Sequence, residues 1–513
     1  MKNISVQSFK SVLQQCFGSK SIPKKIAIGL SGGPDSMLLV WLLSKYKSYM
    51  QDDTVELHAI TIDHNYRPES TIEAEQISQV MQRWNVKHTI KKLNYNVDPK
   101  TIANFEEVAR TKRYEAIRSI CNTLGISIVV LGHHCDDQVE TFVQRLQGNS
   151  SIFGLACTRQ VSNIPLTEDL DPSQLSTFSP VRLVRPLLAF EKKTILSTCK
   201  LNGIPYVVDP TNNDTKLTRR NYLRNLFGRL LPQMMVDFGS QEGKSCSGVA
   251  EVASTCFPYK SITKDELAKS QQECARLAQQ FESKAYRLYR QLLRQHKFSE
   301  SPEFGSLQMK LPKKCLIGYN KIITSKFLYQ RLYPYSTLNH YHWAYAKLER
   351  GLLPKLESFL LSSRSAVVRY SIMNLIFEVT NNDSASEVEI SITRAPLTRT
   401  ELKISSFEVA INQYWSQWYL YDKRFWLRFK SLEETDSVIT IGPYLHKIHS
   451  SIVSKSLKAN SVVNIDKTLD TLPAIFQNGR IVAFPTLHIA DTAIKTEWAL
   501  KSNKYDFVDL TIS

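Results

Sequence analysis

One short turn constrains the fold of this chain more than any other feature. The run S-G-G-P-D-S (31–36) follows the apolar stretch 26–30 and precedes a helical stretch at 37–46. Two adjacent glycines allow the backbone to approach a ligand, and a helix start offers free N–H groups and a positive dipole, which suit phosphate. It is not a Walker A loop, because G-x-x-x-x-G-K-[ST] is absent. The alternative is a plain strand-to-helix turn in which Ser and Asp cap the helix.

The same alternation of short apolar runs and helical stretches continues to about residue 230. Further strands are predicted at 55–62 and 126–131, and further helices at 71–84 and 104–124. This βαβα order is typical of a parallel sheet covered by helices on both faces. We therefore predict an α/β fold for the N-terminal part.

The chain is too long, at 513 residues, for a single hydrophobic core. Residues 161–180, with three prolines, are predicted to form an inserted surface loop, and the stretch rich in Ser, Gly and Cys near 237–262 is predicted to end the first domain. We predict an α/β domain at 22–236, a helical middle at 262–385 and a small mixed α/β C-terminal module at 386–513.

Two sequence patterns predict secondary structure in the middle and C-terminal parts of the chain. Apolar residues recur at three- and four-residue steps over 264–295, which predicts a long amphipathic helix. Its other face is basic, through Arg276, Lys284, Arg287, Arg290 and Arg294. A solvated basic face explains this pattern as well as direct RNA contact does. Short alternating runs at 387–392 and 461–465 predict strands in the last part.

The charge balance indicates a polyanionic partner. Lys and Arg number 65 against 48 Asp and Glu, a net charge of +17, which favours a nucleic acid partner over solubility alone. No apolar run approaches the roughly 20 residues of a membrane span, so no membrane partner is expected. The nine cysteines form no C-x-x-C pair, which argues against a zinc ribbon or a dithiol redox motif.

The N-terminal segment has two interpretations. It carries no acidic residue before Asp35, as in many mitochondrial presequences. It also lacks Arg, and Phe9, Leu13 and Phe17 at helical spacing fit an ordinary first helix equally well. The residues alone leave both interpretations open.

Five blocks of sequence resemble one family. The run S-G-G-P-D-S resembles the pyrophosphate loop of the N-type ATP pyrophosphatases, the PP-loop superfamily. Four further blocks resemble the tRNA(Ile)-lysidine synthetases within it. These blocks are L-H-x-x-x-x-D-H-N-Y-R (57–67), N-F-E-x-x-A-R-x-x-R-Y (104–114), G-H-H-C-D-D-Q-V-E-T (132–141), and R-P-L (185–187) with D-P-T-N-N-D (209–214) and R-N-x-x-R (220–224). The C-terminal half resembles the family only loosely, at 472–485, and the resemblance implies that the C-terminal module at 386–513 recognises tRNA.

The resemblance implies an adenine nucleotide α-hydrolase-like domain that uses ATP and Mg²⁺. ATP would adenylate the wobble cytidine of a tRNA(Ile) with a CAU anticodon, and the amine of free L-lysine would expel AMP to give lysidine. A homodimer is left open. The resemblance favours mitochondria if the source is eukaryotic, and the cytoplasm otherwise.

The resemblance also suggests roles for particular residues. ATP binding is expected for Ser31, Gly32, Gly33, Pro34, Asp35, Ser36, Asp63 and His64. Catalytic roles are expected for Asp35, His133, Asp137 and Glu140, and metal binding for Asp136 and Asp137. Contacts with tRNA are expected for Arg110, Arg113, Arg220 and Arg224, although a solvated face explains any one of these arginines about as well.

The acidic block has a structural alternative. Asp137 and Glu140 have capping-box spacing. Asp136 and Glu140, however, are one helical turn apart at a strand's carboxyl end, where carboxylates can hold Mg²⁺ or the ammonium group of lysine. We favour function, with Glu140 holding the lysine, because a cap needs only one of these residues. His133 and His134 have too few Cys or His neighbours for a zinc site, and His133 is expected to donate hydrogen bonds to phosphate.

Two rival functions remain. A tRNA thiolase would use the same adenylation with sulfur as the nucleophile, and Cys135 and Cys199 are the conceivable thiol carriers. A noncatalytic RNA-binding protein on the same fold is the second rival. The complete S-G-G-P-D-S run and the acidic block argue against it.

Overall fold

The computed structural model describes residues 3–18, 22–50, 54–66, 69–165, 169–208, 219–227, 263–362, 365–434, 436–460, 463–490 and 493–505. This described chain forms two compact units. The first comprises residues 1–167 and 179–278, and the second comprises 168–178 and 279–513. No helix among the described residues is long and apolar enough to cross a membrane.

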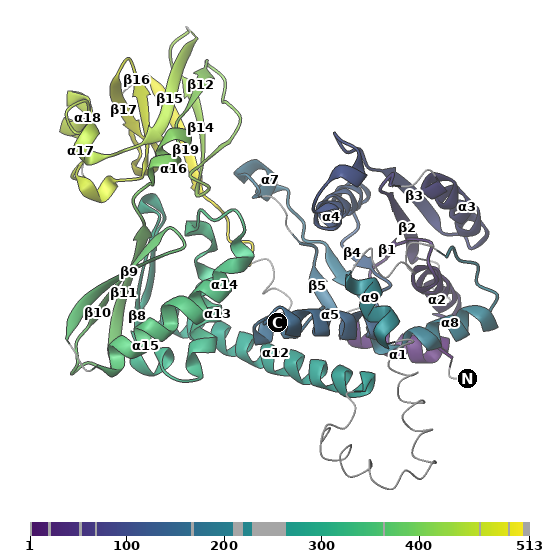
Figure 1. Ribbon diagram of the computed structural model, residues 1–513. Coiled ribbons are helices and arrows are strands. Elements are labelled where there is room, and N and C mark those ends of the chain that lie inside the picture. The colour runs from purple at the N-terminus through teal and green to yellow at the C-terminus, as the bar shows by residue number, and fades with distance from the viewer. Residues whose placement is uncertain are drawn as a thin grey trace. The chain divides into compact units, whose positions relative to one another are not determined.

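The first unit is built on one sheet, which confirms the predicted α/β fold (Figure 1). Six strands of the described chain lie in the order β3-β2-β1-β4-β6-β5, and all pairs are parallel except β5 with β6. Their bounds are β1 Lys25–Gly29, β2 Glu56–Asp63, β3 Lys87–Lys92, β4 Ile128–Val130, β5 Val161–Asn163 and β6 Arg182–Val184.

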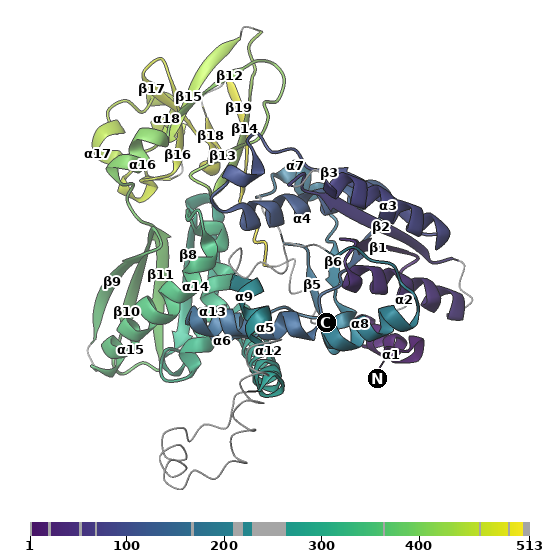
Figure 2. The ribbon, with the colours of Figure 1, turned by 45° about the vertical axis from the view of Figure 1, so that its right-hand side comes forward.

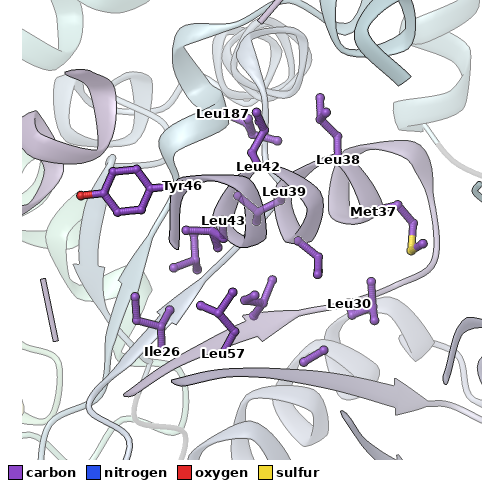
Figure 3. Close-up of a cluster of buried hydrophobic side chains, with 14 of the residues drawn as sticks. Ile26, Leu30, Met37, Leu38, Leu39, Leu42, Leu43, Tyr46, Leu57 and Leu187 are labelled. Carbon is purple, nitrogen blue, oxygen red and sulfur yellow. The ribbon is translucent and has the colours of Figure 1, made fainter. Parts of the chain in front are cut away.

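Helices cover both faces of this sheet. The helices of the first unit are α1 Val6–Phe17, α2 Pro34–Met50, α3 Glu69–Arg83, α4 Phe105–Leu124, α5 Cys135–Gln147, α6 Ile152–Leu155, α8 Lys192–Leu201 and α9 Arg219–Asn225. Side chains alternate along β1, so Ile26 and Ile28 join the core with α1, α2, α3 and α8, whereas Ala27 joins the core with α4. Figure 3 shows Leu39, Leu42 and Leu43 of α2 gathered above Ile26.

The N-terminal segment forms a helix that packs into this core. Phe9, Leu13 and Phe17 of α1 are buried, and the Ser5 side chain caps the helix by accepting from the Ser8 N–H. The apolar spacing of the segment is therefore used for packing. The compartment of the protein stays a prediction.

The prediction of a surface loop over 161–180 is wrong for part of this range. Val161–Asn163 form the edge strand β5, and Pro172–Ser176 form the short helix α7. Residues 168–178 belong to the second unit, where the Tyr333 hydroxyl donates to the Asp169 carboxylate. The proline-rich composition correctly predicted irregular backbone but could not reveal this long-range contact.

The second unit begins along the predicted long helix, α12 Lys264–Arg294. An antiparallel sheet follows in the order β7-β8-β11-β10-β9, with bounds β7 Phe298–Ser301, β8 Ser306–Pro312, β9 Ala366–Ile372, β10 Leu375–Asn381 and β11 Glu387–Arg394. The helices α13 Asn320–Arg331, α14 Ala344–Lys347 and α15 Leu353–Leu361 share its core. The middle part is therefore helical but also contains strands.

The C-terminal part of the second unit contains two further antiparallel sheets (Figure 2). One has the order β12-β15-β16-β17-β18, with bounds β12 Phe407–Ile411, β15 Ser437–Pro443, β16 Pro473–Gln477, β17 Arg480–Phe484 and β18 Ile489–Ala490. The other has the order β13-β14-β19, with bounds β13 Tyr419–Tyr421, β14 Phe425–Ser431 and β19 Ile494–Leu500. The short helices here are α16 Arg399–Ile404, α17 His446–His449 and α18 Lys455–Asn460.

Two details bear on the predicted division of the chain. Strand β11 begins after residue 386 but pairs with β8 and β10, so the preceding sheet extends into the predicted third part. The strand predicted at 461–465 lies partly outside the described residues, and its described remainder is not a strand. The three-part division itself stays a prediction.

Candidate active site

The S-G-G-P-D-S turn lies at the carboxyl edge of the sheet. Hydrogen bonds made by its two serines hold its conformation. The Ser36 hydroxyl donates to the Gly33 carbonyl at 3.0 Å and accepts from the Ser31 N–H at 3.2 Å. Gly32 has φ +81°, and a Cβ there would clash with the Ile77 side chain. Only glycine therefore fits at position 32, and the start of α2 is left facing the edge of the sheet.

Asp35, in the first turn of α2, binds a lysine that sequence reasoning missed. Both carboxylate oxygens accept from Lys192 Nζ at 2.7 Å, and Lys192 is the first residue of α8. The His134 Nε2 lies 3.7 Å from Asp35 Oδ1. A Cβ on Gly132 would lie only 3.2 Å from the Ser36 nitrogen, so glycine allows the end of β4 to approach α2. The segments after β1, β4 and β6 therefore meet at one place.

A buried acid–arginine cluster lies on α5 and α9. Arg220 Nε donates to Glu140 Oε2 at 2.6 Å, Arg224 Nε donates to Glu140 Oε1 at 2.9 Å, and Asp137 Oδ1 accepts from both guanidinium groups. The His134 N–H donates to Asp137 Oδ2 at 3.0 Å, so Asp137 does cap α5, but its capping-box partner is His134 and not Glu140, as the spacing had suggested. Burial alone would raise the pKa of Asp137, but the charges of His134 and Arg220 and this N–H lower it.

These ion pairs bear on two predicted roles, the contact of Arg220 and Arg224 with tRNA and the binding of lysine by Glu140. Arg220 and Arg224 are about one third exposed, with side-chain exposures of 34% and 36%, so each can face ligand while holding a carboxylate. Glu140 is 5% exposed, and both of its oxygens are occupied by guanidinium groups. A lysine amine would have to displace an arginine to reach it. The assignments of these residues to lysine and to tRNA stay predictions.

The two aspartates predicted to bind metal do not form a metal site in this arrangement. Asp136 pairs with Lys264 and also accepts the Lys192 N–H at 3.2 Å. The oxygens of Asp137 are occupied as described above. Across the described parts of the chain, no group of three or more His, Cys, Asp or Glu residues could hold a metal ion. Both carboxylates are engaged by cations in this arrangement, and the assignment of Mg²⁺ to them stays a prediction.

Asp63 is held within the protein rather than aimed at a ligand. Its carboxylate accepts from the Asn65 N–H at 2.8 Å, the Ser70 hydroxyl at 2.7 Å and the Thr71 hydroxyl at 2.8 Å. Burial alone would raise the pKa of Asp63, but these hydrogen bonds lower it. The carboxylate thus fixes the end of β2 to the start of α3. A direct role in ATP binding stays a prediction.

His64 belongs to an aromatic cluster beside Asp63. Its Nδ1 lies 2.9 Å from the Tyr95 hydroxyl, and burial, with the charge of Arg113, lowers its pKa to about 4. Tyr66 stacks on Phe105 with ring centroids 5.0 Å apart, and Tyr95 lies 5.5 Å from the same ring. Phe105 lies in the block at 104–114 but was given no role there, and Tyr95 lies in none of the blocks.

Cations lie next to some of these rings. Lys112 lies over Tyr95 at 5.4 Å, and the charge of Arg113 acts on His64 and Tyr95. Arg110 and Arg113, which had been predicted to contact tRNA, lie over Tyr114 at 5.4 and 5.6 Å, and Arg110 is on the opposite side of α4 from Lys112 and Phe105. An aromatic ring next to a cation can stack a base while the cation contacts phosphate.

His133 is neutral at physiological pH. Burial lowers its pKa to about 4, and among the described residues its Nδ1 has no hydrogen-bond partner. A neutral imidazole can donate a hydrogen bond to phosphate but adds no charge. The cysteines offered as thiol carriers are poorly suited to that role, because burial raises the pKa of Cys135 and raises that of Cys199 to about 11.

Comparisons with known proteins show what the chain is similar to. Residues 2–232 match the family model described as a PP-loop domain. The chain is 25% identical over 471 residues to a probable tRNA(Ile)-lysidine synthase from Schizosaccharomyces pombe, covering 90% of this chain and 91% of the relative. It is 34% identical over 194 residues to the tRNA(Ile)-lysidine synthase of a Bradyrhizobium strain, covering 38% of this chain and 49% of the relative. The chain thus spans about half the length of that bacterial relative.

A solved structure is also similar. A U34-tRNA thiolase from Methanococcus maripaludis matches at 17% identity with a TM-score of 0.32, covering 42% of this chain and 76% of that one.

Two predicted motif positions lie outside the described residues. These are Arg67 and the block at 209–214.

Proposed function

We propose that this chain, a PP-loop enzyme of the tRNA(Ile)-lysidine synthase type, uses ATP to attach free lysine to the wobble cytidine of a tRNA(Ile) with a CAU anticodon. The observation that carries the proposal is the match to a probable lysidine synthase along 90% of the chain. A PP-loop domain alone would not distinguish lysine from other nucleophiles.

The first step would transfer AMP to the tRNA. The ring carbonyl oxygen of the cytidine would attack the α-phosphorus of ATP, and the bond to pyrophosphate would break. The start of α2 offers N–H groups to the phosphates, and Lys192 offers a positive charge next to them, held in place by Asp35. His133 can donate a hydrogen bond without adding charge.

The second step would form lysidine. The amine of lysine would attack the activated ring carbon, so that a C–N bond forms and the C–O bond to AMP breaks. The rings of Tyr66 and Phe105 can stack a base at the edge of the sheet, and Lys112 and Arg113 offer positive charge for its phosphates. The aromatic cluster thus gives the proposed tRNA contacts a base-binding element. Mg²⁺ is proposed on the family resemblance alone, and neither step is derived through it.

The test compares nucleophiles on one tRNA. We expect the purified full chain to release AMP and to incorporate radiolabelled lysine only when ATP, lysine and an unmodified tRNA(Ile) transcript with a CAU anticodon are all present. A transcript with U at the wobble position is the matched control and should incorporate none. AMP release that needs a sulfur donor instead of lysine would favour the thiolase. Binding of tRNA without AMP release under any of these conditions would favour the noncatalytic alternative.

A further inference from the structure

One face of the C-terminal part carries tryptophans and cations that the proposed chemistry does not use. Along β14, Phe425, Leu427 and Phe429 are buried, while Trp426, Arg428 and Lys430 alternate with them and face away from the core. We call the outer side of the sheet β13-β14-β19, together with the adjoining residues 414–418, the tryptophan face. It holds three of the chain's seven tryptophans, Trp415, Trp418 and Trp426.

Contacts within this face fix the rings in place. The Arg428 guanidinium lies over the Trp418 ring at 4.7 Å and over the Trp415 ring at 4.8 Å, and Lys430 Nζ lies 5.1 Å from the Trp415 centroid. The segment that carries both rings is bound to β14 by the Ser416 N–H, which donates to the Phe429 carbonyl at 2.8 Å. The rings are therefore held ready before any ligand arrives, which lowers the entropy cost of binding.

The charge of this face is positive. Glu497, opposite Arg428 on β19, accepts from Arg428 Nε at 2.7 Å and so neutralises one cation. Lys430 and the exposed Lys495 lie opposite each other on the paired strands and add two positive charges. Like charges directly opposite each other destabilise a sheet, so packing alone does not explain their placement.

Packing also does not explain the exposure of the aromatic rings. Trp415 and Trp418 are only partly buried, and the neighbouring Tyr414 is 80% exposed. A tryptophan can cover the stem of an arginine for stability alone. That packing role does not require two additional positively charged lysines next to the tryptophan ring.

We propose that the tryptophan face binds unpaired RNA nucleotides, with bases stacking on Trp415 and Trp418 and phosphates contacting Lys430 and Lys495. Exposed aromatic rings with adjacent cations on a β-sheet are how many proteins bind single-stranded RNA, because every base has a face that can stack. Double-stranded RNA does not expose its bases in this way. The inference rests on the proposed function only in taking RNA as the partner, and it needs no step of the modification chemistry.

The experiment measures binding of the full chain to a fluorescein-labelled single-stranded RNA of twelve nucleotides at low salt. We expect Trp415→Ala and Trp418→Ala each to weaken binding by about tenfold, because stacking on one aromatic ring contributes a factor of roughly 5 to 150. Trp415→Phe, which keeps an aromatic ring, should restore most of the affinity. Lys430→Gln should lower the slope of log affinity against log salt by about one. Trp343→Ala removes an exposed tryptophan elsewhere in the second unit and is the control.

The outcomes separate this inference from the proposed function. Melting temperatures of all variants show whether each is folded, and Lys430→Gln tests the face without removing a ring. Unchanged affinity in folded Trp415→Ala and Trp418→Ala would overturn the inference, as would an equal loss in Trp343→Ala. If the wild type forms lysidine but the tryptophan variants bind RNA normally, only the inference fails. If the face binds RNA but no lysine is incorporated, only the proposed function fails.

Discussion

Lys192 shows how a functional residue can escape a motif search. It lies 157 positions after Asp35, in a stretch without a recognisable signature, yet its ammonium group reaches both oxygens of that carboxylate. The motif predicted that Asp35 lies at the start of a helix at the sheet edge, because that position follows from the local strand–turn–helix pattern. Its partner depends on where α8 packs, which no local pattern specifies.

Lys192→Gln should abolish most AMP formation while leaving the fold intact. The substitution removes the positive charge next to the proposed phosphate site, and loss of one charged contact to a transition state typically costs about 10²–10³ in rate. Lys193→Gln is the matched control, because Lys193 is 80% exposed and pairs with the nearby Glu191 rather than with Asp35. Rates of AMP release measure both variants. Equal rates in Lys192→Gln and Lys193→Gln would remove Lys192 from the site.

Glu140→Gln separates two roles for the buried carboxylate. Because both oxygens accept from arginines, we expect the variant to lose roughly 1–3 kcal/mol of unfolding free energy and to slow AMP formation together with lysine transfer. Urea unfolding and the two product assays measure these effects, with the exposed Glu107→Gln as control. A raised requirement for lysine with unchanged stability and AMP formation would instead restore Glu140 as the lysine-binding group.

At the scale of elements, the sequence predicted the first unit well because its signals are local. The apolar runs gave β1, β2 and β4, and the periodicity gave α2, α3, α4 and α12 to within a few residues. Parallel strands place their carboxyl ends together, so the motif blocks were expected to converge. Strands β3, β5 and β6 were not predicted, because β3 and β5 are largely polar edge strands and β6 has only three residues. The pairing of α9 with α5 was missed because it joins arginines and acids about 80 positions apart.

The turn before α2 gives a test at this scale. Gly32→Ala should lower the unfolding free energy by about 1–2 kcal/mol, because φ is +81° and the added methyl group would clash with Ile77. Gly33→Ala should leave stability unchanged or slightly raised, because its φ is not positive and the nearest atom to a new Cβ is Ser31 Oγ at 3.7 Å. Urea unfolding compares the two variants. Equal stabilities would mean that the turn is not held in this conformation.

At the scale of the whole molecule, buried histidines should make the fold sensitive to acid. Burial lowers the pKa of His64, His88 and His133 to about 4, below the ordinary value of 6.5. The unfolded chain therefore binds more protons than the folded chain between these values. Stability should be complete above pH 6.5 and should fall as the pH drops toward 4. Urea midpoints at pH 7, 6 and 5 measure the fall, which His88→Gln should reduce and the exposed His340→Gln should not.

The net charge of +17 gives the last prediction, that affinity for tRNA falls steeply with salt. Each lysine or arginine that contacts a phosphate releases a counterion, so six contacts would lower the affinity by about 10³ between 50 and 200 mM salt. Fluorescence anisotropy of labelled tRNA with the full chain measures the slope. ATP binding should change far less, because ATP carries few phosphates. A slope corresponding to one or two contacts would mean that the positive charge serves solubility, and that tRNA recognition rests on stacking and hydrogen bonds.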